Sequence, residues 1–176
     1  MTKLLSLDPG AERMGWAVLE DDGEEPWWVD SGIWAFPRGD MDFQPYKLKL
    51  ISFITGRVTT TLSWHSDIDS LVSEIVPAVG GGNFVVATQS YLANSAACTA
   101  QTIAIQHRIP TYQIGATTIK KNIGGKKDAT KVRVRNGVYE FFPFLKESRG
   151  ELWKKIHDES DAIAAGLTHL GYSVPK

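Results

Sequence analysis

The stretch KLLSLDPGAERMGWAV, residues 3–18, constrains the fold of this chain more than any other segment. Its short, mostly apolar run LLSL is typical of a buried strand, and the run ends on the carboxylate of Asp8. Pro9-Gly10 then enforces a turn, and apolar residues resume at Trp16. The pattern predicts two adjacent strands with an acid at the rim of a sheet. That acid either caps the turn or holds a cation and activates water.

The next segments extend this pattern into a meander and a helical region. Residues 3–8, about 15–21 and about 26–36 are predicted strands, and their short connections predict antiparallel pairing. From about 45 to 79 the apolar spacing is helical, as one long helix or two, and Gly80-Gly81-Gly82 is expected to end it. The helical stripe in its second half comprises Ile68, Leu71, Val72, Ile75, Val76 and Val79.

The second half of the chain alternates between strand and helix patterns. Residues 84–87 (FVVA) and 111–114 are predicted buried strands, separated by a helix of small residues from about 92 to 107. That small-residue helix packs either inside the chain or in a dimer. A further helix runs from an Asp128 cap to about Phe141, and a last one from about 158 to 170. We therefore predict one α/β domain, residues 1–176, with a mixed central sheet flanked by helices.

The basic residues are concentrated in one segment, although the net charge of the chain is only −1. Residues 120–135 hold seven of them against one acid, which leaves 12 basic and 19 acidic residues elsewhere. This distribution predicts a phosphate-binding surface, with a solvated helix face as the alternative. The seven residues are Lys120, Lys121, Lys126, Lys127, Lys131, Arg133 and Arg135.

The last helix opens with closely spaced acids. Asp158 and Asp161 are three residues apart, so they are neighbours on one helix face, where a divalent cation would relieve their repulsion. Carboxylate oxygens suit Mg²⁺ or Mn²⁺. The alternative is that these acids complement the helix macrodipole.

Other features limit the setting of the protein. Cys98 is the only cysteine, so an internal disulfide and a cysteine-based zinc site are excluded; we expect it to be a small buried residue. No signal peptide or membrane-spanning stretch is recognisable. A cytoplasmic protein of a bacterium or a phage-infected cell is expected, with no membrane association.

Together these motifs resemble a known family. The segment LSLDPGAERMGWAV resembles the opening strand of the RuvC-type Holliday junction resolvases of the RNase H-like superfamily, and DESDAIAAGLTH resembles their last helix. FVVATQSYLANSA resembles the family's fourth strand and the start of its next helix. Lys120 and Lys131 fall where the family keeps two lysines around a loop that contains glycine. The resemblance covers most of the chain and is weakest over residues 37–79.

The resemblance implies a homodimer that nicks two strands of a four-way DNA junction symmetrically by two-metal phosphodiester hydrolysis. Asp8, Asp158 and Asp161 match three of the four metal-binding carboxylates, with Mg²⁺ or Mn²⁺ as cofactor. Lys120 and Lys131 match lysines near the scissile bond. Tyr91 matches an aromatic position expected to contact branched DNA.

One position departs from the family. Its second acid falls on Thr88, with Gln89 matching the residue that follows. Threonine carries no negative charge, so we expect a weakened or inactivated metal site, natural or engineered, and Thr88→Glu is predicted to restore cleavage.

Two other functions stay open at this point. The first is a branched-DNA binding protein on the same fold that does not cleave. The second is a sugar-kinase or actin-like phosphotransferase. That class requires two such domains, and 176 residues are too few. No nucleotide cofactor is expected.

Overall fold

A single mixed sheet organises the computed structural model, which describes residues 1–76 and 84–175. Within those residues the strand order is β3-β2-β1-β4-β5. The first three strands form an antiparallel meander, and β4 and β5 continue the sheet in parallel with β1. The predicted mixed α/β fold is therefore confirmed. The strands are β1 Thr2–Asp8, β2 Arg13–Asp21, β3 Pro26–Ala35, β4 Ser70–Glu74 and β5 Thr111–Ile114.

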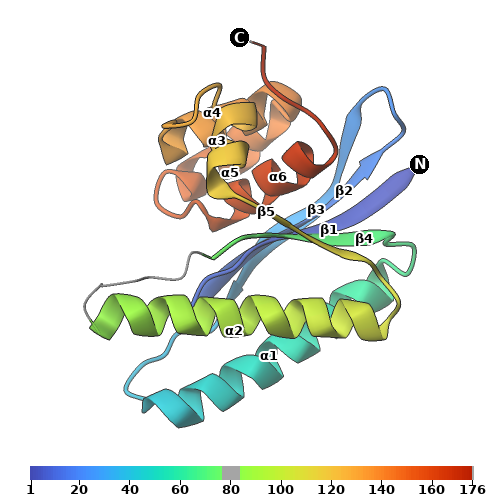
Figure 1. Ribbon diagram of the computed structural model, residues 1–176. Coiled ribbons are helices and arrows are strands. Elements are labelled where there is room, and N and C mark those ends of the chain that lie inside the picture. The colour runs from blue at the N-terminus through green and yellow to red at the C-terminus, as the bar shows by residue number, and fades with distance from the viewer. Residues whose placement is uncertain (77–83, 176) are drawn as a thin grey trace.

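Helices cover both faces of this sheet, as Figure 1 shows. Two long helices lie side by side on one face, α1 Phe43–Trp64 and α2 Phe84–Gln106. Shorter helices lie on the other face: α3 Ala116–Ile123, α4 Lys131–Phe141, α5 Phe144–Trp153 and α6 Asp158–His169. In the described part of the chain, no helix is both long and apolar enough to cross a membrane.

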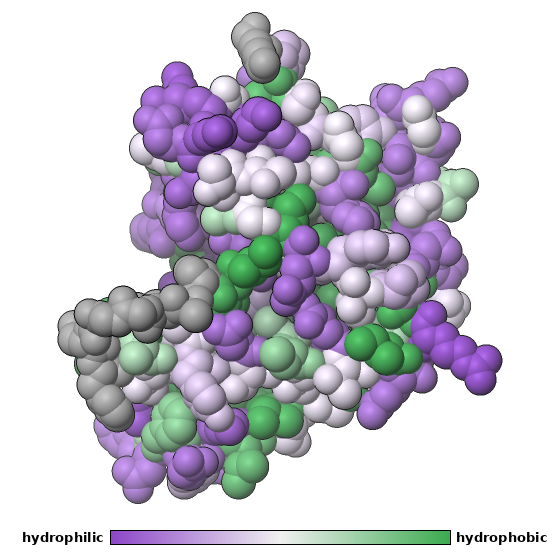
Figure 2. Space-filling view, viewed as in Figure 1, coloured by the Kyte–Doolittle hydropathy of each residue, from purple (hydrophilic) through white to green (hydrophobic). Residues whose placement is uncertain are grey.

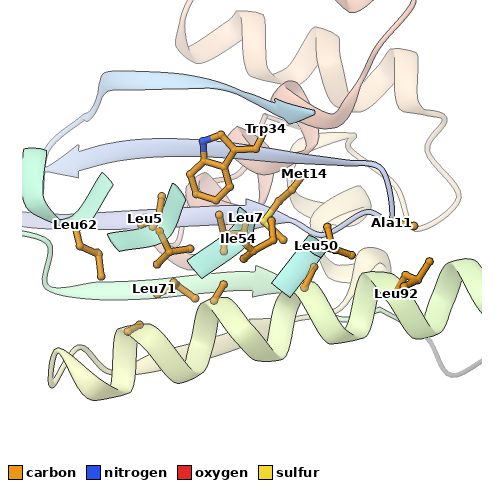
Figure 3. Packing of buried hydrophobic residues seen from close by; sticks show 14 of the residues in the cluster. Leu5, Leu7, Ala11, Met14, Trp34, Leu50, Ile54, Leu62, Leu71 and Leu92 are labelled. Carbon is orange, nitrogen blue, oxygen red and sulfur yellow. The ribbon is translucent and has the colours of Figure 1, made fainter. Parts of the chain in front are cut away.

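Side chains of the central strand β1 alternate between the two helical layers. Leu5 and Leu7 belong to the core shared with α1 and α2, seen at close range in Figure 3. Leu4 belongs to the core on the opposite face, and the hydroxyl of Ser6 donates to the carbonyl of Ala162 on α6 at 2.8 Å. Because side chains alternate with a period of two along a strand, Asp8 lies on the α6 face.

The helix predicted across residues 68–79 is wrong where β4 lies. The sequence pattern looks helical because side chains on both faces of Ser70–Glu74 are apolar or buried. A parallel strand covered by helices on both faces shows no clean alternation, and a short apolar run cannot separate strand from helix. The predicted glycine stop at 80–82, and Val79, lie outside the described residues.

The strand predicted at 84–87 is also wrong, since these residues form the first turn of α2. The run FVVA looked buried, yet the side chains of Val85 and Val86 are 65% and 44% exposed. Further along α2, Ala96, Ala100 and Ala104 pack into the core against α1 and the sheet. The small residues of this helix thus serve packing within the chain. Cys98, predicted to be buried, is exposed.

The helices between β5 and the last helix differ from the prediction in number and in their caps. Helix α3 was not predicted within the basic segment, nor was α5 after Pro143. The N-cap of α4 is Thr130, whose side chain accepts a bond from the amide of Arg133 at 3.4 Å. Asp128, predicted as that cap, instead pairs with Lys126 at 3.3 Å. The last helix begins at Asp158 as predicted.

Candidate functional site

Two parallel neighbouring strands, β1 and β4, bring acids to the same edge of the sheet. Their register pairs Leu7 with Ser73. The next residues, Asp8 and Glu74, are the last of the two strands and therefore lie side by side at the edge of the sheet. Ser73 accepts a bond from Gln101 of α2 and therefore faces that helix. Glu74, the next residue, faces the opposite layer, as Asp8 does. Both carboxylates thus project toward α6.

Helix α6 supplies the two remaining acids from its first turn. Asp158 begins the helix and Asp161 lies one turn further on. The approach of α6 to the sheet depends on Gly15 of β2, which pairs with Asp8 in the sheet register. A Cβ atom at Gly15 would lie 1.8 Å from the carbonyl oxygen of Asp158, so only glycine leaves room for the helix start. This close contact sets Asp158 directly over the end of β1.

The pKa values of these acids show that they repel one another inside a partly dehydrated pocket. Burial raises the pKa of the Asp8 carboxyl well above its usual range, and the charges of Asp161 and Glu74 raise it further. Burial, followed by the charge of Asp161, also raises the pKa of Glu74. The pKa of Asp161 is raised by burial in the same way, although Lys131 opposes the shift. Four carboxylates therefore share one negative site.

Two basic side chains lie against this acidic cluster. The ammonium of Lys131, the first residue of α4, lies 2.8 Å from Oδ2 of Asp161. Burial lowers the pKa of Lys131, but the carboxylates of Asp161, Asp8 and Asp158 together outweigh it, so the net shift is upward. Nε of Arg13 lies 3.3 Å from Oδ2 of Asp158. Lys120 of α3 is close enough to lower the pKa of Glu74.

The donor set fits a hard divalent cation, since it consists of carboxylate oxygens alone. Oδ2 of Asp158 is buried and accepts no hydrogen bond, and its charge is met by the Arg13 guanidinium at 3.3 Å. As arranged here, however, no group of three or more His, Cys, Asp or Glu side chains among residues 1–76 and 84–175 is placed so that it could hold a metal ion. Lys131 and Arg13 partly neutralise Asp161 and Asp158 in that arrangement. A cation would take over that role at the same oxygens.

Thr88, predicted to stand at the missing acid position, does not lie at the end of a strand. It lies in α2, whose first residues the sequence suggested were a strand. Glu74, which sequence reasoning assigned to a helix, ends the strand beside β1 instead. A signal for it was present. Its strand SLVSE and the end of the first strand, LLSLD, are both short runs of apolar residues and serine that end on an acid.

The remaining predicted DNA-contacting residues fall into two groups. Lys121, Lys126, Lys127 and Arg133 are exposed around α3 and α4, where Figure 2 shows a hydrophilic surface over the upper helices. Arg135 is half-buried and its guanidinium donates to the carbonyl of Trp153 at 3.0 Å. That bond gives Arg135 a structural role in joining α4 to α5.

Tyr91 lies on α2, apart from the basic surface. Its ring is 47% exposed and packs at 5.7 Å from the ring of Phe43, with the Lys47 ammonium 4.7 Å above it. Two residues earlier on α2, Gln89 lines a cavity of ≈ 460 Å³ together with Arg13 and Asp158. The N-terminal part of α2 therefore borders the acidic site.

Comparisons with known proteins find similarity to junction resolvases. No protein-family model matches the chain. A crossover junction endodeoxyribonuclease RuvC of Gluconobacter oxydans is 25% identical over 178 residues, covering 96% of this chain and 90% of that protein. The chain is therefore similar to the RuvC endonucleases over nearly its whole length. The RuvC of Actinobacillus pleuropneumoniae serotype 5b is 24% identical over 169 residues, with 96% and 78% covered.

The fold of a solved RuvC structure is also similar to the fold of this chain. Thermus thermophilus RuvC in complex with a Holliday junction substrate matches with a TM-score of 0.75 and 19% identity, covering 100% of both chains. The chain therefore has the RNase H-like fold of that structure, as the sequence resemblance implied.

Proposed function

We propose that this protein resolves four-way DNA junctions as a metal-dependent endodeoxyribonuclease. The observation that carries the proposal is the parallel pairing of β4 with β1, which delivers Glu74 beside Asp8 beneath the two acids of α6. The RuvC relatives are named as crossover junction endodeoxyribonucleases, and one similar structure holds a Holliday junction. The set of four carboxylates is complete once Glu74 replaces Thr88 in it.

In this proposal Asp8, Glu74, Asp158 and Asp161 would hold Mg²⁺ or Mn²⁺. When bound, such ions supply a nucleophilic water and stabilise charge on the leaving oxygen. The four carboxylates orient the ions and keep the centre negative, so that a phosphate binds only when cations accompany it. The raised pKa values of Asp8, Glu74 and Asp161 mean that a bound cation relieves strong repulsion between like charges.

The neighbouring basic residues are proposed to meet the DNA backbone. Lys131 is 58% exposed at its side chain while its ammonium holds Asp161, so it can turn from that carboxylate to a phosphate. Lys120 lies near Glu74 on the same side. Lys121, Lys126, Lys127 and Arg133 extend this positive surface outward from the site. Sequence-independent contacts of this kind provide affinity and steep salt dependence.

We infer a homodimer, because symmetric cleavage of a junction requires two sites related by a two-fold axis. The buried alanines of α2 are used within the chain, so the dimer surface is expected on exposed residues. Tyr91, half-exposed beside the acidic site, is proposed to contact the junction DNA.

The deciding experiment compares Glu74→Gln with two variants of Thr88. In a cleavage assay on four-way junctions with Mg²⁺ or Mn²⁺, Glu74→Gln should lower the rate by at least about 100-fold, because a neutral amide replaces a charge that stabilises the transition state. Thr88→Ala should cleave within a few-fold of the wild type. Thr88→Glu should give no gain, contrary to the expectation from sequence alone.

Binding measured in parallel separates the alternatives. Gel shifts on four-way, three-way and linear duplex DNA should show tighter binding to the four-way junction for the wild type and for Glu74→Gln. If the wild type binds junctions without cutting them in either metal, the protein is a non-cleaving junction binder. Full activity of Glu74→Gln would remove Glu74 from the metal site.

A further inference from the structure

Between the two acids of α6 lies a third, Glu159, that the proposed chemistry does not use. Its residue surface is only 1% exposed. A carboxylate is almost never buried so completely unless charged or hydrogen-bonding groups pair with it. Oε1 accepts a bond from the hydroxyl of Ser31 at 2.7 Å, and Oε2 accepts one from Nε1 of Trp153 at 2.8 Å. Nε of Arg149 lies 3.4 Å from Oε1.

These partners come from elements on the side of α6 that faces away from the metal-binding acids. Ser31 belongs to β3, whereas Arg149 and Trp153 belong to α5. Successive helical residues are turned by about 100° around the axis, so Glu159 points roughly opposite to Asp161. The contacts of Glu159 therefore fix the rotation of the first turn of α6 without touching the site itself.

The first turn of α6 requires such a restraint. His157, at the N-cap position, forms no side-chain capping bond to the helix. A helix start without a cap frays readily, because its first amides lack partners. Asp158 and Asp161 lie in that turn three residues apart, so their like charges are neighbours on one helix face and repel each other. A freely moving turn would relieve the repulsion by separating the two acids.

The network around Glu159 is continuous across four elements, β3, α6, α5 and α4. The hydroxyl of Ser31 donates to Glu159 and accepts a bond from Nε1 of Trp28 at 2.9 Å. Trp153 is fully buried and stacks on Tyr139 of α4 at 5.5 Å between ring centroids. A buried carboxylate with two donors and a cation is fully satisfied here, and such a network specifies one arrangement of its members.

We propose that Glu159 is a positioning residue for the metal site: it locks the first turn of α6 so that Asp158 and Asp161 face Asp8 and Glu74. This inference rests on the proposed function only for the identity of the site. The restraint itself is a property of the fold, so it can be measured without metal and without DNA.

The experiment uses the full chain with Glu159→Ala and Glu159→Gln. The glutamine keeps the shape of the side chain and one accepting oxygen but loses the charge opposite Arg149. Mn²⁺ affinity, measured by titration calorimetry without DNA, should fall by about 10- to 100-fold in the alanine variant and less in the glutamine variant. In junction cleavage, kcat should fall in the same order while KM stays within about two-fold.

Amide hydrogen exchange gives a readout independent of metal. Amides of residues 158–161 should exchange faster in Glu159→Ala without metal, because the first turn opens locally. Trp153→Phe and Ser31→Ala, which each remove one donor, should show the same change to a smaller degree. If Glu159→Ala does not fold, these two variants provide the same hydrogen-exchange test.

The matched control is Val58→Ala, a core truncation on the opposite face of the sheet. It should lower the melting temperature while leaving Mn²⁺ affinity and exchange of residues 158–161 unchanged. Unchanged exchange and Mn²⁺ affinity in Glu159→Ala would overturn the inference, as would equal losses in Val58→Ala. A third outcome separates the two proposals. If Glu159→Ala shows faster exchange and weaker Mn²⁺ binding while the wild type itself does not cleave junctions, the role of Glu159 is upheld and the proposed function is rejected.

Discussion

Gly15→Ala tests whether the close approach of α6 to the sheet creates the site. The added Cβ would lie 1.8 Å from the carbonyl oxygen of Asp158 and 3.0 Å from the amide nitrogen of Glu159. Both atoms are backbone, so no side chain can move aside. To reach ordinary van der Waals separation the first turn of α6 must withdraw by roughly 1.5 Å. Overpacking of this kind costs about 1–3 kcal/mol of folding free energy.

The functional loss should exceed the loss of stability. A shift of about 1 Å in a catalytic group can lower a rate by about 100-fold, and both Asp158 and Asp161 lie on the displaced turn. We expect junction cleavage to fall by at least about 100-fold. The melting temperature, measured by circular dichroism, should fall by only about 2–12 °C for a chain of this size. Binding of junction DNA should persist, since the basic surface on α3 and α4 is not displaced.

Gly56→Ala provides the control. Gly56 lies in the middle of α1, and a Cβ there would meet nothing within 4 Å. Alanine should stabilise that helix by roughly 0.5–1 kcal/mol and leave cleavage unchanged. If Gly15→Ala instead cleaves and melts like the wild type, the helix start tolerates displacement and the geometric account of the site is refuted.

Two further outcomes follow from other contacts. Tyr46 is fully buried, and its hydroxyl proton is shared between the carbonyls of Ala11 and Phe36, at 2.6 and 2.7 Å, so Tyr46→Phe should cost about 1 kcal/mol in urea unfolding. Burial, with the charge of Glu12, raises the pKa of Tyr46 to about 12. Between pH 10 and 12 the unfolded chain therefore releases a proton that the folded state keeps, so the free energy of unfolding should fall as the pH rises through this range. Tyr46→Phe should lack that fall. Replacing exposed Lys121 and Lys127 with Ala should flatten the salt dependence of junction affinity, lowering the slope of log K against log salt by roughly 2 in gel-shift titrations; an unchanged slope would mean that these lysines only solvate the surface.

The electrostatic design of the site has a cost for folding. Asp8, Glu74 and Asp161 all have raised pKa values, first because of burial, so the metal-free fold holds charges that would be better solvated in the unfolded chain. The ion pair between Lys131 and Asp161 offsets part of that cost. Cation binding to the folded state should therefore stabilise the protein, by an amount that grows with the logarithm of the free cation concentration once the site is filled.

The sequence by itself determined the two ends of the site. The run LLSL ending on Asp8 before Pro9-Gly10 admits little besides a buried strand and a turn, and the structure places β1 there. The acids of the last helix were equally clear, because Asp158 and Asp161 open a run of small apolar residues. In both places local pattern and tertiary structure agree, as they do where a sequence is minimally frustrated.

Only the tertiary structure decided between Glu74 and Thr88. The segments around 70–74 and 84–87 are both short and rich in apolar residues, and neither has a periodicity that separates strand from helix. The first is a strand because it inserts between β1 and β5 and is covered by helices on both faces; the second is a helix with its valines exposed to solvent. Whether Glu74 or Thr88 lies beside Asp8 depends on that strand pairing. Strand pairing across more than sixty residues of chain is a non-local choice that local sequence does not encode.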